Sequence, residues 1–452
     1  MRILIYGLNY APEVTGVGKY TAEMAELLAA HGHEVRVICA PPYYPQWRVH
    51  DGYRAGRYTR ETLRGVSVWR APLWVPSQQG GFKRIVHLAS FALSSLPLLA
   101  RLAAWRPEAV MLIVPTLFCA PGALMLARAV GARSWLHIQD FEVDAAFDLG
   151  LLRGGQGSRL GRAALAGERW LLRRFDVVSS ISARMVERAI DKGVDAARAV
   201  CLPNWVDTRA IFPLPYPSAF RRRLGIPQDN TVVLYSGNMG AKQGIDILAD
   251  VATALAARSD ISFVFCGDGA AKRELMVRCE PLSNCHVLPL QPSSMLNELL
   301  NVADIHVLPQ RNDAADLVMP SKLTGMLASG RAVVAMARPG TSLFDVVSDH
   351  GIVVPPEDSK ALAAAIVDLA GDPARRAGLG RAARRYAKRM LSPQAIFDVL
   401  EARLAGLAGE VAAASGAASA QQCAGQSANQ NRPASQAGKG GSTLPEVEQS
   451  DV

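Results

Sequence analysis

The sequence predicts an α/β protein of two doubly wound domains, each a parallel sheet with helices on both faces. The chain has 452 residues, more than one hydrophobic core usually supports. Short and almost wholly apolar runs alternate with helix-length stretches, which is typical of parallel strands buried on both faces. This alternating series occurs twice along the chain, so we expect two domains.

Six apolar runs in each half are the predicted strands, because they are bounded by Gly, Asp, Asn or Ser and separated by helix-length segments. In the first half they are 3–6, 34–39, 66–71, 110–114, 134–138 and 177–180. In the second half they are 231–235, 262–266, 286–288, 305–308, 332–335 and 351–353.

A proline-rich segment separates the two halves. Four prolines fall within fifteen residues between 203 and 217, which predicts a hinge. We therefore expect an N-terminal domain over 1–204 and a C-terminal domain over 205–391. An amphipathic helix is expected over 392–408. The remaining Ala-, Gly-, Ser- and Gln-rich segment, 409–452, is expected to be disordered because it cannot bury enough apolar surface.

The net charge and the cysteines indicate which partners and which cellular compartment to expect. The net charge of +9 attracts nucleic acid, anionic lipid or phosphorylated substrates without distinguishing them. No helix-turn-helix, zinc-finger or RNA-recognition pattern is present, so a nucleic-acid partner is not expected. The seven cysteines form no CxxC pair, which favours a reducing, cytoplasmic setting.

The most lipophilic stretch of the chain runs from Ile85 to Ala100. His87 and Pro97 interrupt it, and it is shorter than the ~20 apolar residues that a spanning helix needs. The chain also opens directly on a strand-like run rather than on a secretory signal. We expect a buried or surface-lying helix here and no transmembrane segment.

The first candidate site is the glycine-containing loop that follows the first strand. Gly16, Val17 and Gly18 precede a predicted helix, where backbone N–H groups are able to approach an anion. The pattern matches neither the dinucleotide fingerprint nor the P-loop. Glycines needed only for the loop geometry are the alternative.

A second candidate lies at the end of the strand over 134–138. His137 and Asp140 are followed closely by two more acids, Glu142 and Asp144. An imidazole titrates near neutrality and carboxylates accept hydrogen bonds, so the cluster is suited to orient hydroxyls or to take a proton. A structural histidine is the alternative.

The third candidate is the loop Ser236–Gly244, which leads from a strand into a helix. Gly237, Asn238 and Gly240 give clearance for a ligand, the helix N-terminus supplies N–H donors, and Lys242 supplies a positive charge. Because of this spacing we expect the loop to bind a diphosphate. A simple strand-to-helix turn is the alternative.

Two later strand-end loops complete the candidate site. The first is a small-residue turn, and the second places acids, a serine and a lysine before a predicted helix, where they are suited to contact sugar hydroxyls and phosphate. Capping of that helix by Ser321 is the structural alternative. The residues concerned are Gly267, Asp268, Gly269, Asp313, Asp316, Pro320, Ser321 and Lys322.

No two aspartates in the chain stand at DxD spacing. An enzyme that uses a sugar nucleotide without that pair must neutralise the leaving diphosphate with N–H groups, helix dipoles and cationic side chains. We therefore predict no metal ion and no cofactor, the sugar nucleotide being a substrate.

Taken together, these motifs resemble the retaining GT-B glycosyltransferases of the glycogen-synthase-like superfamily. The resemblance runs from residue 1 to about 405. Within the superfamily the chain is similar to the colanic-acid-type exopolysaccharide fucosyltransferases. The landmarks that carry it are LIYGLNYAPEVTGVGKYT, HIQD, PNWVD, SGNMGAKQG, FCGDG, LPLQPSSMLNELLNVADIHVLPQ and MPSKLTGMLASGRAVVA.

The resemblance implies two Rossmann-like domains facing across a cleft, with the last helix crossing back to the first domain. It implies transfer of a sugar from a nucleoside-diphosphate donor with retained configuration. A GDP-sugar, and GDP-fucose first, is favoured over a UDP-sugar. The implied acceptor is a lipid-linked saccharide, so the protein is expected on the inner face of the cytoplasmic membrane as a peripheral protein.

The resemblance also assigns roles. Lys242 would stabilise the departing diphosphate, Asp316 or Asp313 would contact the transferred sugar, and His137 with Asp140 would orient hydroxyls. The chain departs from the family pattern at two positions. Asn238 stands where an arginine is usual, and Gly325 stands where a glutamate normally grips the donor ribose.

Two other functions are compatible with the same motifs. A nucleotide-sugar epimerase has the same two-domain architecture and acts without an acceptor. A non-catalytic sugar-nucleotide-binding subunit of a polysaccharide assembly would bind the donor without turnover. Acceptor-dependent release of a nucleoside diphosphate distinguishes a transferase from both.

Overall fold

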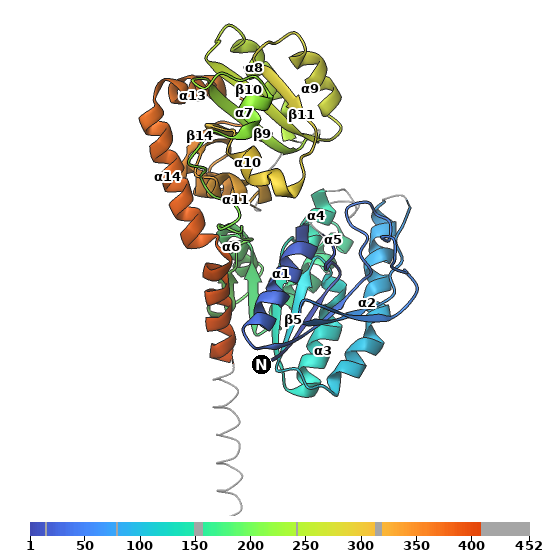
Figure 1. Cartoon of the computed structure of the whole chain (residues 1–452). Helices are drawn as coiled ribbons and strands as arrows, with labels where there is room; N and C mark the ends of the chain where they lie inside the picture. Colours follow the sequence, from blue (N-terminus) through green and yellow to red (C-terminus); the bar gives the residue numbers. More distant parts are fainter. Residues whose placement is uncertain (14–15, 78–79, 149–156, 241–242, 312–318, 408–452) are drawn as a thin grey trace, which may run out of the picture. The chain divides into compact units, whose positions relative to one another are not determined.

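The computed structural model describes residues 1–13, 16–77, 80–148, 157–240, 243–311 and 319–407. It contains two largely parallel sheets, each flanked by helices (Figure 1). The N-terminal sheet has the order β3-β4-β2-β1-β5-β6-β7-β8, and the C-terminal sheet has the order β11-β10-β9-β12-β13-β14. Since the order changes direction beside β1 and beside β9, both sheets are doubly wound, and the predicted fold class is confirmed.

The elements of the N-terminal sheet lie close to their predicted positions. Its strands are β1 (Arg2–Gly7), β2 (Glu34–Cys39), β3 (Thr59–Leu63), β4 (Val66–Arg70), β5 (Ala109–Val114), β6 (Arg133–Ile138), β7 (Val177–Ser180) and β8 (Ala199–Cys201). Its helices are α1 (Gly16–Ala30), α2 (Gly81–Ala103), α3 (Ala120–Val130), α4 (Glu142–Asp148), α5 (Arg159–Leu172) and α6 (Ala183–Asp191), with a 3₁₀ turn, η1 (Leu117–Cys119).

The C-terminal sheet repeats this alternation. Its strands are β9 (Thr231–Asn238), β10 (Ile261–Asp268), β11 (Cys285–Leu288), β12 (Ile305–Leu308), β13 (Ala332–Met336) and β14 (Ile352–Val354). Its helices are α7 (Ala219–Arg223), α8 (Ile245–Ala254), α9 (Lys272–Cys279), α10 (Leu296–Leu300), α11 (Ser321–Ala328), α12 (Ser342–His350), α13 (Ser359–Gly371) and α14 (Pro373–Met390). A last helix covers 393–407, and the predicted disordered tail lies outside the described residues.

Two strands of the N-terminal sheet were not predicted. β3 pairs antiparallel with β4 at one edge, and β8 is a strand of three residues at the other. The sequence of β3 is TRETL, with exposed or half-buried side chains, and polar edge strands lack the continuous apolar run that marks a buried parallel strand.

The lipophilic stretch at 85–100 forms the middle of α2, which is longer than the stretch itself. One face of α2, including Leu88, Phe91 and Leu102, is buried in the hydrophobic core of the N-terminal sheet. Of the helices among the described residues, α2 is the one long and apolar enough to cross a membrane by length and composition. Buried core helices meet the same criterion, and this one packs against the sheet.

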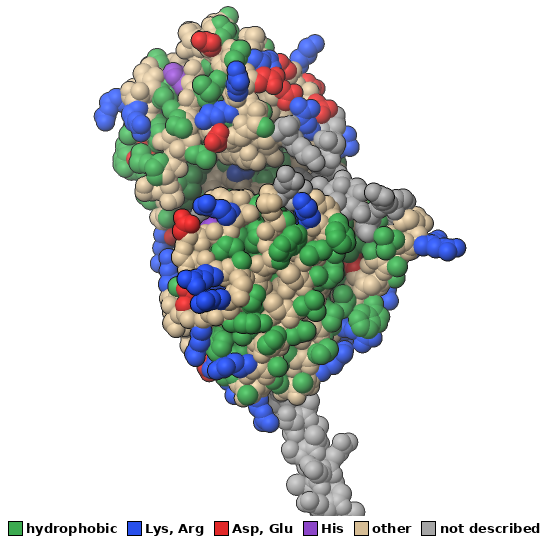
Figure 2. Space-filling model, turned by 90° about the vertical axis from the view of Figure 1, so that its right-hand side faces the viewer, with side chains coloured by type: hydrophobic (Ala, Val, Ile, Leu, Met, Phe, Trp, Pro, Cys, Tyr) green, Lys and Arg blue, Asp and Glu red, His purple; other side chains and the backbone are tan. Residues whose placement is uncertain are grey.

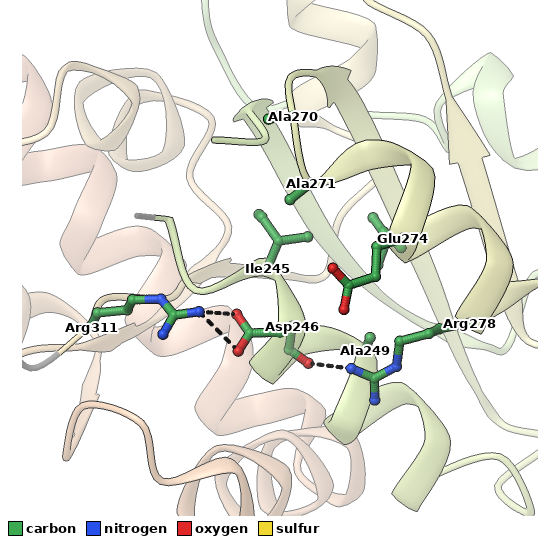
Figure 3. Close-up of a pocket in the computed structure, with 9 residues that line it drawn as sticks. Ile245, Asp246, Ala249, Ala270, Ala271, Glu274, Arg278 and Arg311 are labelled. Atoms are coloured by element: carbon green, nitrogen blue, oxygen red, sulfur yellow. Dashed lines mark hydrogen bonds and ion pairs between the residues drawn. The ribbon is translucent and has the colours of Figure 1, made fainter. Parts of the chain in front are cut away.

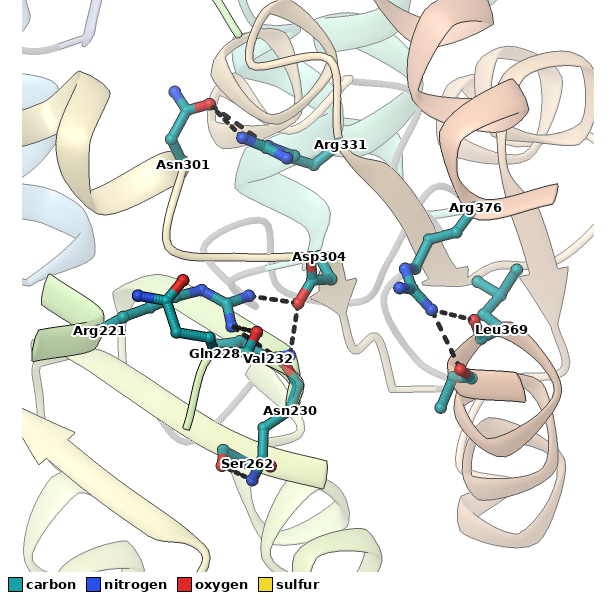
Figure 4. Close-up of polar contacts among 11 residues, drawn as sticks. Arg221, Gln228, Asn230, Val232, Ser262, Asn301, Asp304, Arg331, Leu369 and Arg376 are labelled. Carbon is teal, nitrogen blue, oxygen red and sulfur yellow. Dashed lines mark hydrogen bonds and ion pairs between the residues drawn. The ribbon is translucent and has the colours of Figure 1, made fainter. Parts of the chain in front are cut away.

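A polar contact secures the start of the C-terminal sheet (Figure 4). Asp304, directly before β12, accepts hydrogen bonds from the guanidinium of Arg221 and from the backbone N–H of Val232, the latter at 2.8 Å. Arg221 also donates to the carbonyl oxygens of Gln228 and Asn230, at 3.2 and 2.9 Å. One ion pair therefore connects α7, the entry to β9 and the entry to β12.

We expect Asp304→Ala to destabilise the protein by about 2–4 kcal/mol, because it leaves Arg221 Nη2 and the Val232 N–H without their acceptor. Urea unfolding followed by circular dichroism measures the change. The matched control is Asp260→Ala, which removes an exposed pair with Arg258 and should cause little loss. Equal effects of the two substitutions would contradict the assignment.

Candidate functional site

The carboxyl ends of β9 and β10 stay paired as far as their last residues. Gly267 lies opposite Gly237, and Asp268 lies opposite Asn238. A Cβ atom on Gly267 would stand 1.9 Å from the carbonyl oxygen of Gly237, and Gly269 has φ +146° with the facing turn 2.6 Å from an added Cβ. The glycines at 267 and 269 are therefore required for the two strand ends to approach.

Lys322, in the first turn of α11, brings a positive charge beside Gly237. Its Nζ donates to the Tyr235 hydroxyl and to Gln243 Oε1, both at 3.1 Å, and lies 4.5 Å from the centre of the Tyr235 ring. A Cβ on Gly237 would be 3.4 Å from Lys322 Cδ. The Lys322 side chain thus lies alongside the end of β9.

Burial lowers the pKa of Lys322 to about 8. Burial is the cause of this shift, and the described contacts of the amine are with Tyr235 and Gln243 rather than with a carboxylate. Withdrawal of an ammonium from water is costly unless a charge of opposite sign compensates it. An anionic ligand beside Gly237 would supply that compensation.

The start of α11 is also open to an anion. Pro320 occupies the N-cap position, and no side chain caps the first turn. Capping by Ser321, the structural alternative, is not observed, because Ser321 is the first helical residue and its carbonyl accepts from the Thr324 hydroxyl. The uncapped N–H groups of this turn and the charge of Lys322 lie at one helix end, which favours phosphate.

A cavity of about 870 Å³ adjoins these groups. It brings together four of the predicted donor residues: Gly16, Gly237, Ser321 and Lys322. Gly325 lines it too. Its lining also includes Glu23 and residues of the landmark segments that were not predicted as site residues, among them Lys19, Trp205, Ser236, Leu290, Gln291 and Leu296. The other predicted site residues that the structure describes do not line this cavity. They are Val17, Gly18, His137, Asp140, Asn238, Gly240, Gly267, Asp268, Gly269 and Pro320.

The predicted N-terminal loop has two different parts. α1 begins at Gly16, which has φ +62°, so residues 16 to 18 form the first turn of the helix. Gly18 is packed against the Glu13 carboxylate, which an added Cβ would approach to 2.6 Å. Glu13 accepts hydrogen bonds from the backbone N–H groups of Tyr43 and Tyr44, both at 3.0 Å. Gly18 and Glu13 therefore shape the loop, whereas Gly16 reaches the cavity.

The proline-rich connection contributes Trp205 to the cavity. Its indole N–H donates to Glu23 on α1 at 2.7 Å, and its ring makes an edge contact with Tyr20, the ring centres being 5.3 Å apart. The PNWVD landmark is thus anchored on the same helix that begins at Gly16.

His137 is buried rather than open to a ligand. Its Nδ1 is 2.9 Å from the Ser179 hydroxyl, and its Nε2 is 3.1 Å from Gln139 Nε2. Burial lowers the pKa of His137 to about 4, so the ring is neutral at physiological pH. Gln139 in turn accepts from Asn204 at 3.1 Å. This polar chain joins the HIQD landmark to PNWVD, a connection that the sequence alone does not reveal.

The other predicted site residues that the structure describes lie on the surface or in turns. Asp140, Asn238 and Asp268 are exposed, and the Asp268 carboxylate accepts from the N–H of Gly269 at 2.9 Å. Gly240 tolerates a Cβ, since its nearest neighbour would be Asn238 at 3.4 Å. The predicted residues Lys242, Asp313 and Asp316 lie outside the described residues.

A second, smaller pocket of about 240 Å³ lies between α8 and α9 (Figure 3). Both of its arginines already have partners. Arg311 donates to both carboxylate oxygens of Asp246, at 2.9 and 3.0 Å, and Arg278 donates to the Asp246 carbonyl and to Asp250. Phosphate binding is therefore better placed at Lys322. Among the described residues, no group of three or more His, Cys, Asp or Glu side chains is arranged to hold a metal ion.

Two family models match the chain, one in each half. A glycosyl transferase 4-like domain matches residues 15–205, and a domain described as glycosyl transferases group 1 matches residues 230–372. The protein named as a colanic acid biosynthesis glycosyl transferase, WcaI, of Escherichia coli (strain K12) is 45% identical over 376 residues, which are 81% of this chain and 91% of WcaI. The D-inositol 3-phosphate glycosyltransferase of Kineococcus radiotolerans is 30% identical over 215 residues, 43% of this chain and 48% of that protein.

Solved structures share the fold at low sequence identity. The sucrose-phosphate synthase of Thermosynechococcus elongatus matches with a TM-score of 0.68 and 18% identity, over 92% of this chain and all of that chain. HepE of Anabaena, solved with UDP and glucose, matches with a TM-score of 0.61 and 16% identity, over 90% of this chain and all of that chain. Because both domain models match in order and the identity to WcaI extends over almost its whole length, the resemblance inferred from the motifs is confirmed: the chain belongs to the GT-B glycosyltransferases.

Proposed function

We propose that this glycosyltransferase moves a sugar, with retained configuration, from a nucleoside-diphosphate donor to a lipid-linked saccharide during exopolysaccharide synthesis. It would act without a metal ion at the inner face of the cytoplasmic membrane. GDP-fucose is the first donor to test, followed by other GDP-sugars and then UDP-sugars. The 45% identity to a colanic acid biosynthesis glycosyl transferase supports a role in exopolysaccharide synthesis.

The observation that carries the donor half of the proposal is the Lys322 amine beside Gly237. It is partly buried, lies beside the end of β9, and makes its described contacts with Tyr235 and Gln243 rather than with a carboxylate. A diphosphate leaving group develops negative charge as the glycosidic bond breaks, and a preorganised cation with adjacent N–H groups stabilises that charge. Gly237 and the first turn of α11 supply such N–H groups on the same cavity.

Within this proposal the other predicted roles remain to be tested. Lys242 would add a second charge on the diphosphate, and Asp316 or Asp313 would contact the transferred sugar. Asp140 would orient hydroxyls directly. The buried His137 would act through Gln139 and Asn204, as a positioning residue.

The central experiment incubates purified protein with a panel of sugar nucleotides, with and without a membrane lipid extract, and measures released nucleoside diphosphate and labelled lipid. Lipid-dependent release of GDP or UDP together with labelled lipid is the expected result, unchanged by EDTA. Conversion of the donor without an acceptor would indicate an epimerase. Binding of donors without any turnover would indicate a non-catalytic subunit.

We expect Lys322→Ala to lower kcat/KM for the donor at least ~100-fold, because an oxyanion-stabilising group is typically worth that much. The matched control is Lys360→Ala, an exposed lysine on α13, which should retain full activity. Lys242→Ala is expected to cause a loss of similar size. Near-normal activity of Lys322→Ala would remove this residue from the mechanism.

The lowered pKa of Lys322 predicts how the use of the donor depends on pH. Since the pKa of Lys322 is lowered to about 8, its amine is cationic below that pH and neutral above it, so kcat/KM should fall as the pH rises through about 8. In Lys322→Arg the guanidinium stays charged, and the decline should move to higher pH. A wild-type profile that is flat to pH 9.5 would contradict the assignment.

A further inference from the structure

A third cavity, distant in sequence from the donor residues, lies at the carboxyl edge of the N-terminal sheet. It has a volume of about 390 Å³ and is lined by α2, η1, α3, α4 and α5. Its walls are mostly apolar, with Ile85, Leu88, Phe118, Val143 and Leu171 among them. The volume is within the range of small-molecule pockets, roughly 300–1,000 Å³. We call it the α2 pocket.

One side chain of the α2 pocket has an unused hydrogen-bonding atom. Glu142 Oε2 accepts from the N–H of Leu117 at 2.6 Å, whereas its Oε1 is buried and has no partner among the described residues. Burial raises the pKa of Glu142 to about 7, an effect that Arg84 opposes and Asp140 and Glu168 reinforce. A buried carboxyl oxygen without a partner is costly, so the pocket is incomplete without a polar ligand group.

Two neighbouring acids, Glu168 and Asp144, have cationic partners. Glu168, which also lines the pocket, accepts from the Lys192 amine, and the same amine donates to Asp144 at 2.8 Å. Arg188 donates to Asp144 at 3.2 Å. These contacts hold α4 and α5 against α6, so the pocket walls are fixed by a polar network that lies behind them.

The α2 pocket adjoins an exposed apolar surface. Ile85 and Phe118 both line the pocket and are 41% and 49% exposed. Along the same helices Phe82, Leu93 and Met125 are 78%, 68% and 65% exposed. Figure 2 shows hydrophobic side chains gathered over the body that carries α2, with Lys and Arg side chains around them. Such a contiguous apolar surface is typical of contact with a membrane or another protein.

The charges on these helices have one sign. α2 and the segment 117–130 contain no Asp or Glu, whereas they carry the four cations Lys83, Arg84, Arg101 and Arg128. Of these, Arg84 lines the pocket itself. An apolar surface on helices that carry cations and no carboxylates is suited to an amphiphile that has a hydrocarbon part and a phosphate group.

We propose that the α2 pocket binds the hydrocarbon chain of a phosphate-bearing lipid, with Arg84 and Lys83 facing the phosphate and Glu142 Oε1 taking a hydrogen bond at the head group. The lipid is the one that carries the acceptor saccharide, so this inference rests on the proposed function. It assigns the pocket to acceptor capture and leaves donor chemistry to Lys322 and its neighbours.

The test measures binding of farnesyl phosphate, below its micelle concentration, to the full chain by isothermal titration calorimetry without any donor. Inorganic phosphate supplies the charge without the chain, and farnesol supplies the chain without the charge. Farnesyl phosphate should bind at least tenfold more tightly than either. Equal affinity for inorganic phosphate would show an ordinary anion site and would overturn the proposal.

Two variants locate the binding. Ala164→Trp places a large ring into the pocket wall and should weaken farnesyl phosphate binding at least tenfold. The matched control is Ala163→Trp, on the exposed face of the same helix, which should bind normally. If Ala164→Trp fails to fold, Phe118→Ser, a change at a half-exposed position, should weaken binding at least threefold. Unchanged affinity in the folded pocket variant would place the ligand elsewhere.

Activity measurements distinguish failure of the α2-pocket assignment from failure of the proposed function. Donor hydrolysis or transfer to a water-soluble saccharide should be unchanged in Ala164→Trp, whereas transfer to the lipid extract should fall at least tenfold. Wild-type protein that transfers sugar to lipid but binds no farnesyl phosphate would overturn the pocket assignment and leave the function standing. If the wild-type protein self-associates and Ala164→Trp abolishes this, the surface binds a second copy of the chain. That result would also overturn the lipid proposal.

Discussion

The donor side of this molecule depends on how closely the backbones of β9 and β10 approach at their carboxyl ends. The strands remain in register to Asn238 and Asp268 only because Gly267 presents no Cβ to the carbonyl oxygen of Gly237. Pairing past the hydrophobic core keeps the two strand ends from diverging. It leaves Gly237 lining the cavity, where a Cβ atom at this position would lie 3.4 Å from Lys322 Cδ.

The charge arrangement around that strand end explains how one lysine is held ready for an anion. Tyr235 offers Lys322 both a hydroxyl acceptor and the face of its ring, and Gln243 offers a second oxygen. These neutral contacts fix the amine in place without neutralising it, whereas a carboxylate partner would. The contrast with Arg311, which is bound by both oxygens of Asp246, shows why two cations of the same domain differ in what they are able to bind.

Much of the fold was predictable from the sequence because the patterns that mark strands and helices lie within short segments of the chain. Buried parallel strands are continuous apolar runs, and strands such as 34–39 and 177–180 were placed to the residue. Edge strands β3 and β8 lack that signal. The segments after the strands were also identifiable, since Gly16 and Lys322 stand in the first turns of helices and Gly237 stands at the end of a strand.

What the sequence does not reveal are contacts between residues far apart in the chain. Nothing near Tyr235 indicates that it meets a lysine 87 residues later. The pattern around His137 suggests an exposed acid–base group, whereas the ring is enclosed and connected through Gln139 to Asn204. The unpartnered oxygen of Glu142 depends on the packing of five separate segments, so a cluster of acids in the sequence gives no sign of which one is isolated.

The depressed basicity of Lys322 has a further chemical consequence. At a pH near 8 about half of these amines carry a free electron pair, whereas an ordinary surface lysine is less than ~1% deprotonated there. Lys322 is therefore the more nucleophilic amine towards acylating or aldehyde reagents of modest size, and it borders a cavity that admits them. Covalent labelling of Lys322 that is slowed when the natural anion occupies the site would therefore mark this enzyme at its donor site.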